Sequence, residues 1–426
     1  MERVATAPAV PCDIRDLALA DAGRRRIEWA SLTMPVIRTI RKQFIRSQPF
    51  AGIRIAASLP VTAETANLMI TLRDGGAVPF LSGSNSLSTQ DDVAASLVRD
   101  FQIPVFAIRD SSPELSESHL AAALQSKPHI TMDSEAAFGR LLLTRFQDHV
   151  PGLIGCTEET GSGASRFRTM VRTGTLAFPV IAADEAPTKS FFDGRYGTGQ
   201  STFDNVIRLT GILVAGMNVV VAGYGGCGQA IAARARGLGA NVIVTETDPA
   251  RALEAAMDGY RVAPMAEAAP LGQLFITVTG NRNVLAREMF ERIRDGAVLC
   301  NAGHSNVEID VPGLARAAGS RGETREGVEE FKMRDGRRIY LLAEGRLMGL
   351  ASGDGHAASV MDISFATQAL SAEYLLKNQS SLDKLVYSVP EGIDKRVARI
   401  KLDSMGVAID KLTIEQEQYL ASCEGS

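Results

Sequence analysis

The segment from Met217 to Pro249 constrains the fold of this chain more than any other. A β-branched run at 219–222 leads into Gly-Tyr-Gly-Gly-Cys-Gly at 223–228, then into a helical pattern and a second strand-like run that ends at Glu246. In this order the glycines permit a tight turn, a close approach of the backbone to a pyrophosphate, and packing of the helix on the strand. The helix N-terminus faces the anion. The segment therefore predicts a dinucleotide site, with NAD as the expected cofactor.

Length and composition set the outer limits. A chain of 426 residues can hold two or three domains, and its 45% hydrophobic and 22% charged residues are ordinary for an α/β protein. A net charge of −4 with scattered basic residues argues against nucleic acid or a membrane as partner. The five cysteines have no metal-ligand spacing, so no metal site is expected, and reduced thiols predict a cytoplasmic protein. No signal peptide or bilayer-spanning run is expected.

Strand-like and helix-like segments alternate along most of the chain, which predicts parallel sheets covered by helices. The strands expected in the first third are 53–59, 78–82, 105–108 and 129–132, and those expected around the glycine loop are 219–222, 241–245, 274–279 and 297–301. The charged segment 323–338 is expected to be a surface excursion, and 361–374 a long helix that returns to the first domain. The predicted fold class is α/β.

Three polar residues outside the glycine loop allow two interpretations each. Lys189 and Asp193 are four residues apart and would share one face of a helix. Exposed, they would form an ordinary ion pair; buried, the lysine would have a lowered pKa and could accept a proton. Asp133 ends a predicted strand, where an aspartate serves either as a helix cap or as a catalytic group.

A set of collinear motifs resembles the S-adenosylhomocysteine hydrolase family over residues 53–420, nearly the whole chain. Besides the glycine loop, the resemblance is carried by Asn85–Asp91 (NSLSTQD), Glu158-Glu159-Thr160, Thr188-Lys189-Ser190-x-Phe192-Asp193, Asn301-Ala302-Gly303-His304, Leu342–Leu347 (LAEGRL), Gly355-His356 and Leu412-Thr413. Enzymes of this family use tightly bound NAD+ to oxidise the ribose 3′ carbon of the substrate. The ketone acidifies the 4′ proton, its removal allows elimination of homocysteine, water adds, and the hydride returns. The resemblance implies hydrolysis of S-adenosylhomocysteine to adenosine and homocysteine.

The resemblance implies that the chain is divided into three parts. Residues 1–187 correspond to a substrate-binding domain that is completed by about 357–388, and 200–354 to a Rossmann-type NAD-binding domain. Residues 389–426 form a C-terminal helical tail for oligomerisation. The expected partners are an adenosine-type nucleoside or thioether substrate and further copies of the chain, as a dimer or tetramer.

The resemblance also implies roles for individual side chains. Lys189 and Asp193 correspond to the pair that handles the 3′ hydroxyl proton. Asp133 corresponds to the catalytic aspartate near the 4′ and 5′ carbons, and His304 to a catalytic group beside the ribose and homocysteine. The implied substrate-binding residues are Thr62 and Glu64 at the purine, Glu159 at the ribose, and His356 near the base and nicotinamide.

The expected cofactor contacts come from several separate regions of the sequence. Glu246 would accept the ribose hydroxyls of NAD and repel a 2′ phosphate, although Arg251 leaves NADP open. The full expected set is Thr160, Gly161, Ser162, Gly194, Gly223, Gly225, Gly226, Cys227, Gly228, Glu246, Arg251, Thr279, Ala302, Gly303 and Gly349.

The chain departs from the family pattern inside this site. Pro60 stands where the family has a histidine for protons at the 5′ carbon, and proline cannot transfer a proton. Gly194 and Gly349 replace asparagines near the cofactor, 160–162 replaces a run of threonines, and Ala357 replaces a proline. These changes leave an alternative: a diverged paralogue that uses 3′ oxidation of an adenosine-like nucleoside for epimerisation, elimination or net redox chemistry. A third hypothesis is a catalytically inactive NAD-binding regulator, against which the retained pair Lys189 and Asp193 argues.

Overall fold

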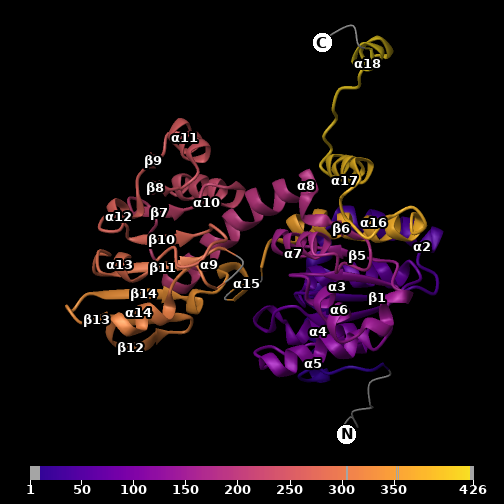
Figure 1. Cartoon of the computed structure of the whole chain (residues 1–426), viewed down its shortest axis with the longest axis horizontal. Coiled ribbons are helices and arrows are strands. Elements are labelled where there is room, and N and C mark those ends of the chain that lie inside the picture. The colour runs from indigo at the N-terminus through magenta and orange to yellow at the C-terminus, as the bar shows by residue number, and fades with distance from the viewer. Residues whose placement is uncertain (1–9, 304–305, 352, 354, 423–426) are drawn as a thin grey trace.

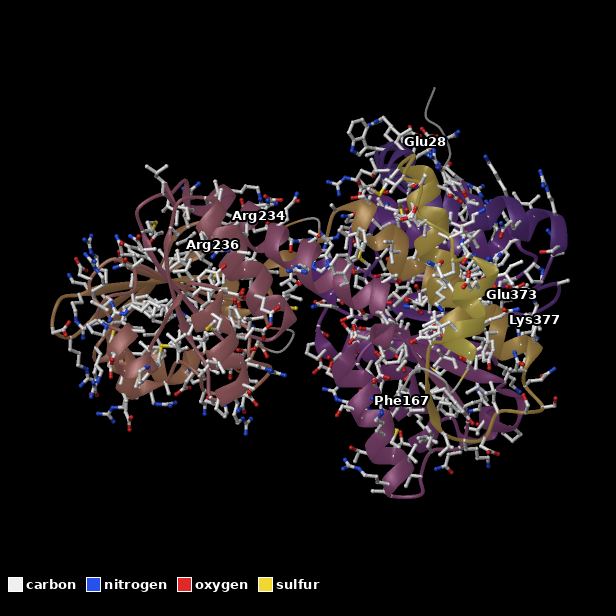
Figure 2. The ribbon with its side chains drawn as sticks, turned by 90° about the horizontal axis from the view of Figure 1, so that it is seen from above. Glu28, Phe167, Arg234, Arg236, Glu373 and Lys377 are labelled. Carbon is white, nitrogen blue, oxygen red and sulfur yellow. The ribbon has the colours of Figure 1, made fainter. Side chains whose placement is uncertain are left out.

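Two separate β-sheets, each flanked by helices, make up the molecule (Figure 1). The structure is a computed structural model, and it describes residues 10–303, 306–351, 353 and 355–422. A continuous helical stretch runs from one sheet to the other (Figure 1). It consists of α8 (Pro187–Ser190), a π-helical segment (Phe191–Thr198) and α9 (Gly199–Thr210). Seen from above, Arg234 and Arg236 lie on one lobe, and Phe167, Glu373 and Lys377 lie on the other (Figure 2).

The first sheet is fully parallel and has the strand order β15-β6-β5-β4-β1-β2-β3. Its strands are short apolar runs whose two faces are covered, as is usual for parallel sheets. They are β1 (Arg54–Leu59), β2 (Val78–Gly83), β3 (Val105–Phe106), β4 (Ile130–Asp133), β5 (Gly155–Glu158), β6 (Val180–Ala182) and β15 (Val386–Ser388). The flanking helices are α1 (Ala20–Leu32), α2 (Pro35–Ser47), α3 (Ala63–Asp74), α4 (Asp91–Arg99), α5 (Pro113–Leu124), α6 (Ala137–Thr144), α7 (Gly161–Arg172), α16 (Ala358–Lys377) and α17 (Glu391–Ser404).

The C-terminal part of the chain returns to this first sheet. The strand β15 pairs with β6, and α16 packs against α2, α3 and β5. The carboxylate of Asp362 on α16 accepts hydrogen bonds from the backbone N–H groups of Val36 (3.1 Å) and Ile37 (2.8 Å) and from Lys401 Nζ (3.3 Å). Because these bonds are buried or partly buried, they fix α16 to the start of α2 and to α17.

The second sheet has the order β12-β13-β14-β11-β10-β7-β8-β9. It is parallel from β14 to β9 and antiparallel from β12 to β14. Its strands are β7 (Asn218–Ala222), β8 (Asn241–Thr245), β9 (Arg261–Val262), β10 (Leu274–Thr277), β11 (Ala297–Asn301), β12 (Ala318–Arg325), β13 (Val328–Met333) and β14 (Arg338–Leu342). The helices here are α10 (Gly226–Gly237), α11 (Pro249–Met257), α12 (Met265–Ala268), α13 (Arg287–Phe290), α14 (Val311–Ala317) and α15 (Met348–Ala351).

The charged segment 323–338 is not a surface excursion, as the sequence suggested. It contains β13 and the ends of β12 and β14, which continue the sheet by antiparallel pairing. Val328, Phe331 and Met333 are buried, while Glu329 and Glu330 between them are partly buried and Lys332 is exposed. The α/β fold class, with a Rossmann-type second domain, is confirmed. Among the described residues, no helix is long and apolar enough to cross a membrane.

Candidate active site

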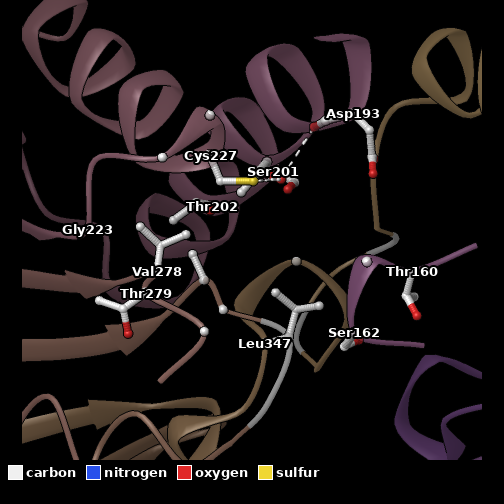
Figure 3. Close-up of a pocket in the computed structure, with 18 of the residues that line it drawn as sticks. Thr160, Ser162, Asp193, Ser201, Thr202, Gly223, Cys227, Val278, Thr279 and Leu347 are labelled. Atoms are coloured by element: carbon white, nitrogen blue, oxygen red, sulfur yellow. Dashed lines mark hydrogen bonds between the residues drawn. The ribbon is translucent and has the colours of Figure 1, made fainter. Parts of the chain in front are cut away.

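A cavity of about 1240 Å³ lies between the two sheets and takes its walls from both. The residues after β1, β4, β5 and β6 of the first sheet meet there those after β7, β8, β10 and β11 of the second. Figure 3 shows Gly223, Cys227 and Val278 on one side of this pocket and Thr160 and Ser162 on the other. Strand ends are where open α/β sheets bind ligands. The volume exceeds the roughly 300–1,000 Å³ of one small-molecule site, so the cavity has room for a cofactor and a substrate together.

The glycine loop has the backbone conformation that a pyrophosphate site requires. Gly223 directly follows β7 with φ +101°, a left-handed conformation that side-chain-bearing residues rarely adopt. A Cβ on Gly228 would lie 2.0 Å from the carbonyl oxygen of Gly223, so this position excludes a side chain. The helix α10 begins at Gly226, and its first N–H groups face the cavity region. These residues fit a dinucleotide.

Glu246 ties the end of β8 to the glycine loop. Its Oε2 accepts a hydrogen bond from the N–H of Tyr224 (2.7 Å), and its Oε1 accepts from Thr247 (2.6 Å) and Asp248 (3.0 Å). Burial raises the pKa of Glu246, but these backbone donors lower it below its usual value. The side chain lines the cavity as an ionised acceptor, with Arg251 on the same wall.

The cavity contains most of the predicted cofactor residues. Those that line it are Thr160, Gly161, Ser162, Gly223, Gly225, Gly226, Cys227, Glu246, Arg251, Thr279, Ala302, Gly303 and Gly349. Gly228 and Gly194 do not. Gly228 is packed on the loop, and a Cβ on Gly194 would lie 3.6 Å from the sulfur of Cys227, which leaves room for a side chain. Among the described residues, no cluster of three or more potential metal ligands occurs.

Lys189 is the centre of charge in the cavity. It lies at the start of the helical stretch between the sheets, and its side chain is only 3% exposed. Its Nζ donates to Asp184 Oδ1 (2.6 Å), to Asp193 Oδ2 (2.9 Å) and to the backbone carbonyl of Glu159 (3.2 Å). The carboxylate of Glu159 lies 3.8 Å away. Three acids thus surround one buried ammonium group.

The predicted lowering of the Lys189 pKa is wrong. Burial alone would lower it, but the three surrounding carboxylates raise the pKa well above its usual value. In this arrangement the lysine is a protonated donor. The prediction failed because the sequence spacing pointed only to Asp193 and not to the other two acids. The buried interpretation of the pair does hold, because Lys189 is almost fully enclosed.

Asp193 connects the lysine to His356. Its second oxygen, Oδ1, lies 2.5 Å from His356 Nδ1. Burial raises the pKa of Asp193, but Lys189 and His356 lower it more, so that it lies well below its usual range. The imidazole fits here because residue 197 is glycine: a Cβ on Gly197 would lie 2.6 Å from His356 Nδ1.

Glu159, which directly follows β5, is held from the opposite side. Its Oε2 accepts a hydrogen bond from Gln368 Nε2 on α16, and Gln368 Oε1 in turn accepts from Thr157 Oγ1 (2.6 Å). Burial raises the pKa of Glu159 to about 7, against the opposing effect of Lys189. This carboxyl group therefore titrates near neutral pH.

Asp133 does not line the cavity. It is completely buried, and its carboxylate accepts hydrogen bonds from the N–H groups of Ser134 (3.0 Å), Phe138 (3.1 Å) and Gly139 (2.9 Å). This is the geometry of a cap for α6, the other interpretation of a strand-end aspartate. The side chain at this strand end that faces the cavity is Ser134.

The remaining predicted residues divide into two groups. Thr62 and Glu64 line the cavity next to Pro60, and Thr62 also caps α3 by accepting from the N–H of Thr65 (3.4 Å). His304 lies outside the described residues.

Several cavity residues were missed from the sequence. They include Ser134, Asp184, Thr198, Ser201, Thr202, Leu347, Met361 and Phe365. Asp184 and Ser134 carried a usable signal, because each follows a short apolar run at the carboxyl end of a parallel strand. Met361 and Phe365 are four apart on α16, a spacing that also suits ordinary core packing.

Two family models match the chain: S-adenosyl-L-homocysteine hydrolase over residues 11–136, and S-adenosyl-L-homocysteine hydrolase, NAD binding domain, over residues 194–355. A relative from Aquifex aeolicus, named adenosylhomocysteinase, is 54% identical over 416 residues, which cover 97% of this chain and 99% of the relative. The chain belongs to the S-adenosyl-L-homocysteine hydrolase family. Relatives of the same name from Nostoc sp. and Thermococcus kodakarensis are each 51% identical, covering 98% and 96% of this chain and 98% and 97% of their own lengths.

Family membership and the loop geometry agree on the cofactor. The family's NAD-binding domain covers the glycine loop, Glu246 and the strand ends that form one wall of the cavity. NAD is therefore the cofactor of this chain, as the sequence predicted.

The glycine loop allows a direct test. In Gly228→Ala the new methyl group would collide with the Gly223 carbonyl, so we expect a loss of at least about 3 kcal/mol of stability and of the NAD that purifies with the protein. Gly237→Ala is the control, because an added Cβ at this end of α10 meets nothing within 4 Å. Thermal melting and the NAD content of both variants are measured. A Gly228→Ala protein with the parent's NAD content would contradict this account.

Proposed function

We propose that this chain is an NAD-dependent enzyme that hydrolyses S-adenosyl-L-homocysteine to adenosine and homocysteine. The observation that carries the proposal is the near-complete coverage of this chain by adenosylhomocysteinases about half identical to it. The cavity supports it, because a buried ion cluster suited to a ribose hydroxyl and a dinucleotide loop share one space. When bound, NAD supplies the reversible oxidation that makes a ribose C–H bond acidic enough to break.

The residues of the chain would divide this work by position. The acids around Lys189 would hold the ribose hydroxyls, since ionised carboxylates accept hydrogen bonds from hydroxyl groups. The Lys189 ammonium would stabilise negative charge on the ribose oxygen as the ketone forms. Thr62 and Glu64 lie in the same cavity wall and would bind the purine.

The chemistry at the 5′ carbon would proceed without the histidine that the family has at the position of Pro60. Leu59 and Pro60 line this wall and carry no titratable group, and Ser134, which follows β4, also lines the cavity. The alternative, a paralogue that epimerises, eliminates or oxidises an adenosine-like nucleoside, drew its support from Pro60 and the two glycines. The comparisons do not favour this alternative, since the named relatives match over almost their full length.

The proposed reaction is tested directly by thiol release. Purified protein with bound NAD is incubated with S-adenosyl-L-homocysteine, and homocysteine is measured with a thiol reagent and adenosine by chromatography. We expect both products in equal amounts. Lys189→Met should lower the rate at least about 10²-fold, whereas the exposed control Lys377→Met should not change it. Release of no thiol, with or without NAD, would exclude the hydrolase assignment.

The pKa of Glu159 gives a pH dependence with a defined sign. Because this pKa is raised to about 7, the carboxyl group is ionised above that pH and protonated below it. If ionised Glu159 binds the ribose, kcat/KM should fall about tenfold per pH unit below about pH 7. Gln368→Leu removes a donor that lowers this pKa, so it should move the step to higher pH. Glu159→Gln should lack the step altogether, and a step that persists there would assign it to another group.

We also propose that the chain forms a homo-oligomer through its C-terminal tail and acts in the cytoplasm. The helix α18 (Ile414–Ala421) stands away from the rest of the chain on an extended segment (Figure 1). Large apolar side chains along 405–420 are exposed, among them Ile409, Ile414 and Leu420. Burying them against a second copy would remove them from water. The free thiols of Cys12, Cys156, Cys227 and Cys300 suit a reducing compartment.

Removal of the tail tests the oligomer. A chain ending at Ser404 should contain fewer subunits per particle by light scattering than the full chain, because the exposed apolar segment is lost. Met257→Ser is the control, since Met257 is an equally exposed apolar residue on α11 of the other lobe. An unchanged number of subunits after truncation would place the interface elsewhere.

A further inference from the structure

The helical stretch that carries Lys189 begins without a cap from its own sequence. Ala186 stands at the N-cap position of α8, and its methyl group cannot accept a hydrogen bond. The next residue, Pro187, has no N–H group. The first backbone donor of the helix is therefore the N–H of Thr188, directly before Lys189. Because the first N–H groups of a helix have no partner inside the helix, this donor needs an acceptor from elsewhere.

The acceptor is Asp394, which lies in the first turn of α17. Its Oδ1 accepts hydrogen bonds from the backbone N–H of Thr188 (3.0 Å) and from Thr188 Oγ1 (2.5 Å). Asp394 is only 9% exposed, so water competes little for these two donors. A carboxylate near a helix N-terminus also interacts favourably with the helix dipole. Asp394 thus acts as the N-terminal cap of α8, although 206 residues separate it from Thr188.

Strand pairing brings the starts of α8 and α17 together. The strands β6 and β15 are parallel neighbours in which Ala182 pairs with Ser388. Thr188 and Asp394 each lie six residues after this pair. Figure 1 shows α17 beside the start of the helical stretch between the lobes. The contact between Thr188 and Asp394 therefore follows from the register of the sheet.

The helix α17 is itself held in place by contacts that do not involve α8. Val397, in its middle, is completely buried in the core of the first domain. Near its end, Lys401 Nζ lies 3.3 Å from the buried carboxylate of Asp362 on α16, which also accepts hydrogen bonds from the start of α2. Asp394 is therefore presented to α8 by a firmly packed helix.

Lys189 depends on the start of α8 because its partners come from three separate segments. Its Nζ lies 2.6 Å from Asp184 after β6, 2.9 Å from Asp193 in the next helical turn, and 3.2 Å from the Glu159 carbonyl after β5. Without a cap the helix start would fray, which would shift the backbone of Lys189 relative to the two strand ends. A displacement of about 1 Å among reacting groups can lower a rate about 10²-fold.

We propose that Asp394 is a positioning residue of the active site. By capping α8 it fixes Lys189 among the acids of the cavity, in the place that oxidation of the ribose requires. This inference rests on the proposed function. Asp394 is not among the residues that line the cavity, so it acts on the reaction through Thr188 and Lys189.

The test separates the speed of the oxidation step from the fraction of protein that is active. Adenosine is mixed with NAD-loaded protein, and the absorbance of reduced nicotinamide is followed in a single turnover, which gives a rate constant and an amplitude. The dissociation constant for adenosine is measured by calorimetry, and the melting temperature of each protein is recorded.

Two substitutions at Asp394 distinguish the hydrogen bonds from the charge. Asp394→Leu has nearly the shape of aspartate but no acceptor, whereas Asp394→Asn keeps an oxygen at the Oδ1 position. The matched control is Asp403→Leu, because Asp403 is an exposed aspartate at the other end of α17.

We expect Asp394→Leu to lower the rate constant about 10- to 100-fold, while the amplitude and the adenosine dissociation constant stay within about threefold of the parent. Asp394→Asn should keep the rate constant within about threefold, because its amide oxygen can still accept from Thr188. Asp403→Leu should behave like the parent.

A second pair of variants keeps the proposal testable if Asp394→Leu melts well below the parent. Thr188→Val loses the hydroxyl bond to Asp394 and should lower the rate constant about fivefold, whereas Thr188→Ser keeps the hydroxyl and should not.

Three results in the variants would overturn the proposal. One is a parent-like rate constant in Asp394→Leu. Another is a lowered amplitude with an unchanged rate constant, which would assign Asp394 a purely structural role. The third is an equal slowing in Asp394→Asn and Asp394→Leu. In each case the parent still reduces its NAD and releases thiol, so the proposed function stands. A parent that does neither would remove the proposed function, and this inference with it.

Discussion

The buried ammonium group of Lys189 is the interaction on which the site depends. Removing a charge from water costs several kcal/mol, so a lysine that is almost completely enclosed requires acids fixed within reach. Asp184 and Glu159 come from the ends of adjacent parallel strands, and Asp193 comes from the next helical turn. Satisfying one charge therefore fixes the positions of two strand ends and of the helix between the lobes.

The same helical stretch also fixes the position of the second sheet. From Lys189 it runs through the π-helical segment into α9, which packs against α10 so closely that a Cβ on Gly199 would lie 3.0 Å from the carbonyl oxygen of Ala230. Across this contact the thiol of Cys227 donates a hydrogen bond to Thr198 Oγ1, with 3.7 Å between sulfur and oxygen. The glycine loop and the ion cluster are thus set at a defined separation by one continuous element, and π-helical segments often occur at such functional positions.

Local sequence patterns were sufficient to predict the helices and strands, but they did not predict how the charged side chains are grouped. Residues 241–245 and 297–301 have the strand limits that their apolar runs predicted, and the glycine loop lies where its spacing required. Most of the site residues that the sequence predicted line the cavity. The sequence could not give the pKa of Lys189, because two of the three acids that raise it, Glu159 and Asp184, are brought to the lysine by strand order rather than by spacing. The segment 323–338 was misjudged because its charged residues outnumber the buried Val328, Phe331 and Met333, which belong to a strand that is paired on both sides.

Two strand-end aspartates show why position alone does not decide function. After Asp133 the backbone turns through left-handed conformations at Glu135 (φ 64°) and Ala136 (φ 55°), which brings N–H groups of the following helix onto the carboxylate. After Asp184 the chain instead continues to Lys189, and one oxygen stays without a donor in the described structure. A buried carboxylate whose oxygens are all bound by backbone N–H groups serves as a cap, because a proton or ligand would have to displace those bonds. A carboxylate that a lysine holds through a single oxygen keeps its other oxygen without a donor, and among the described residues Asp184 is held in this way.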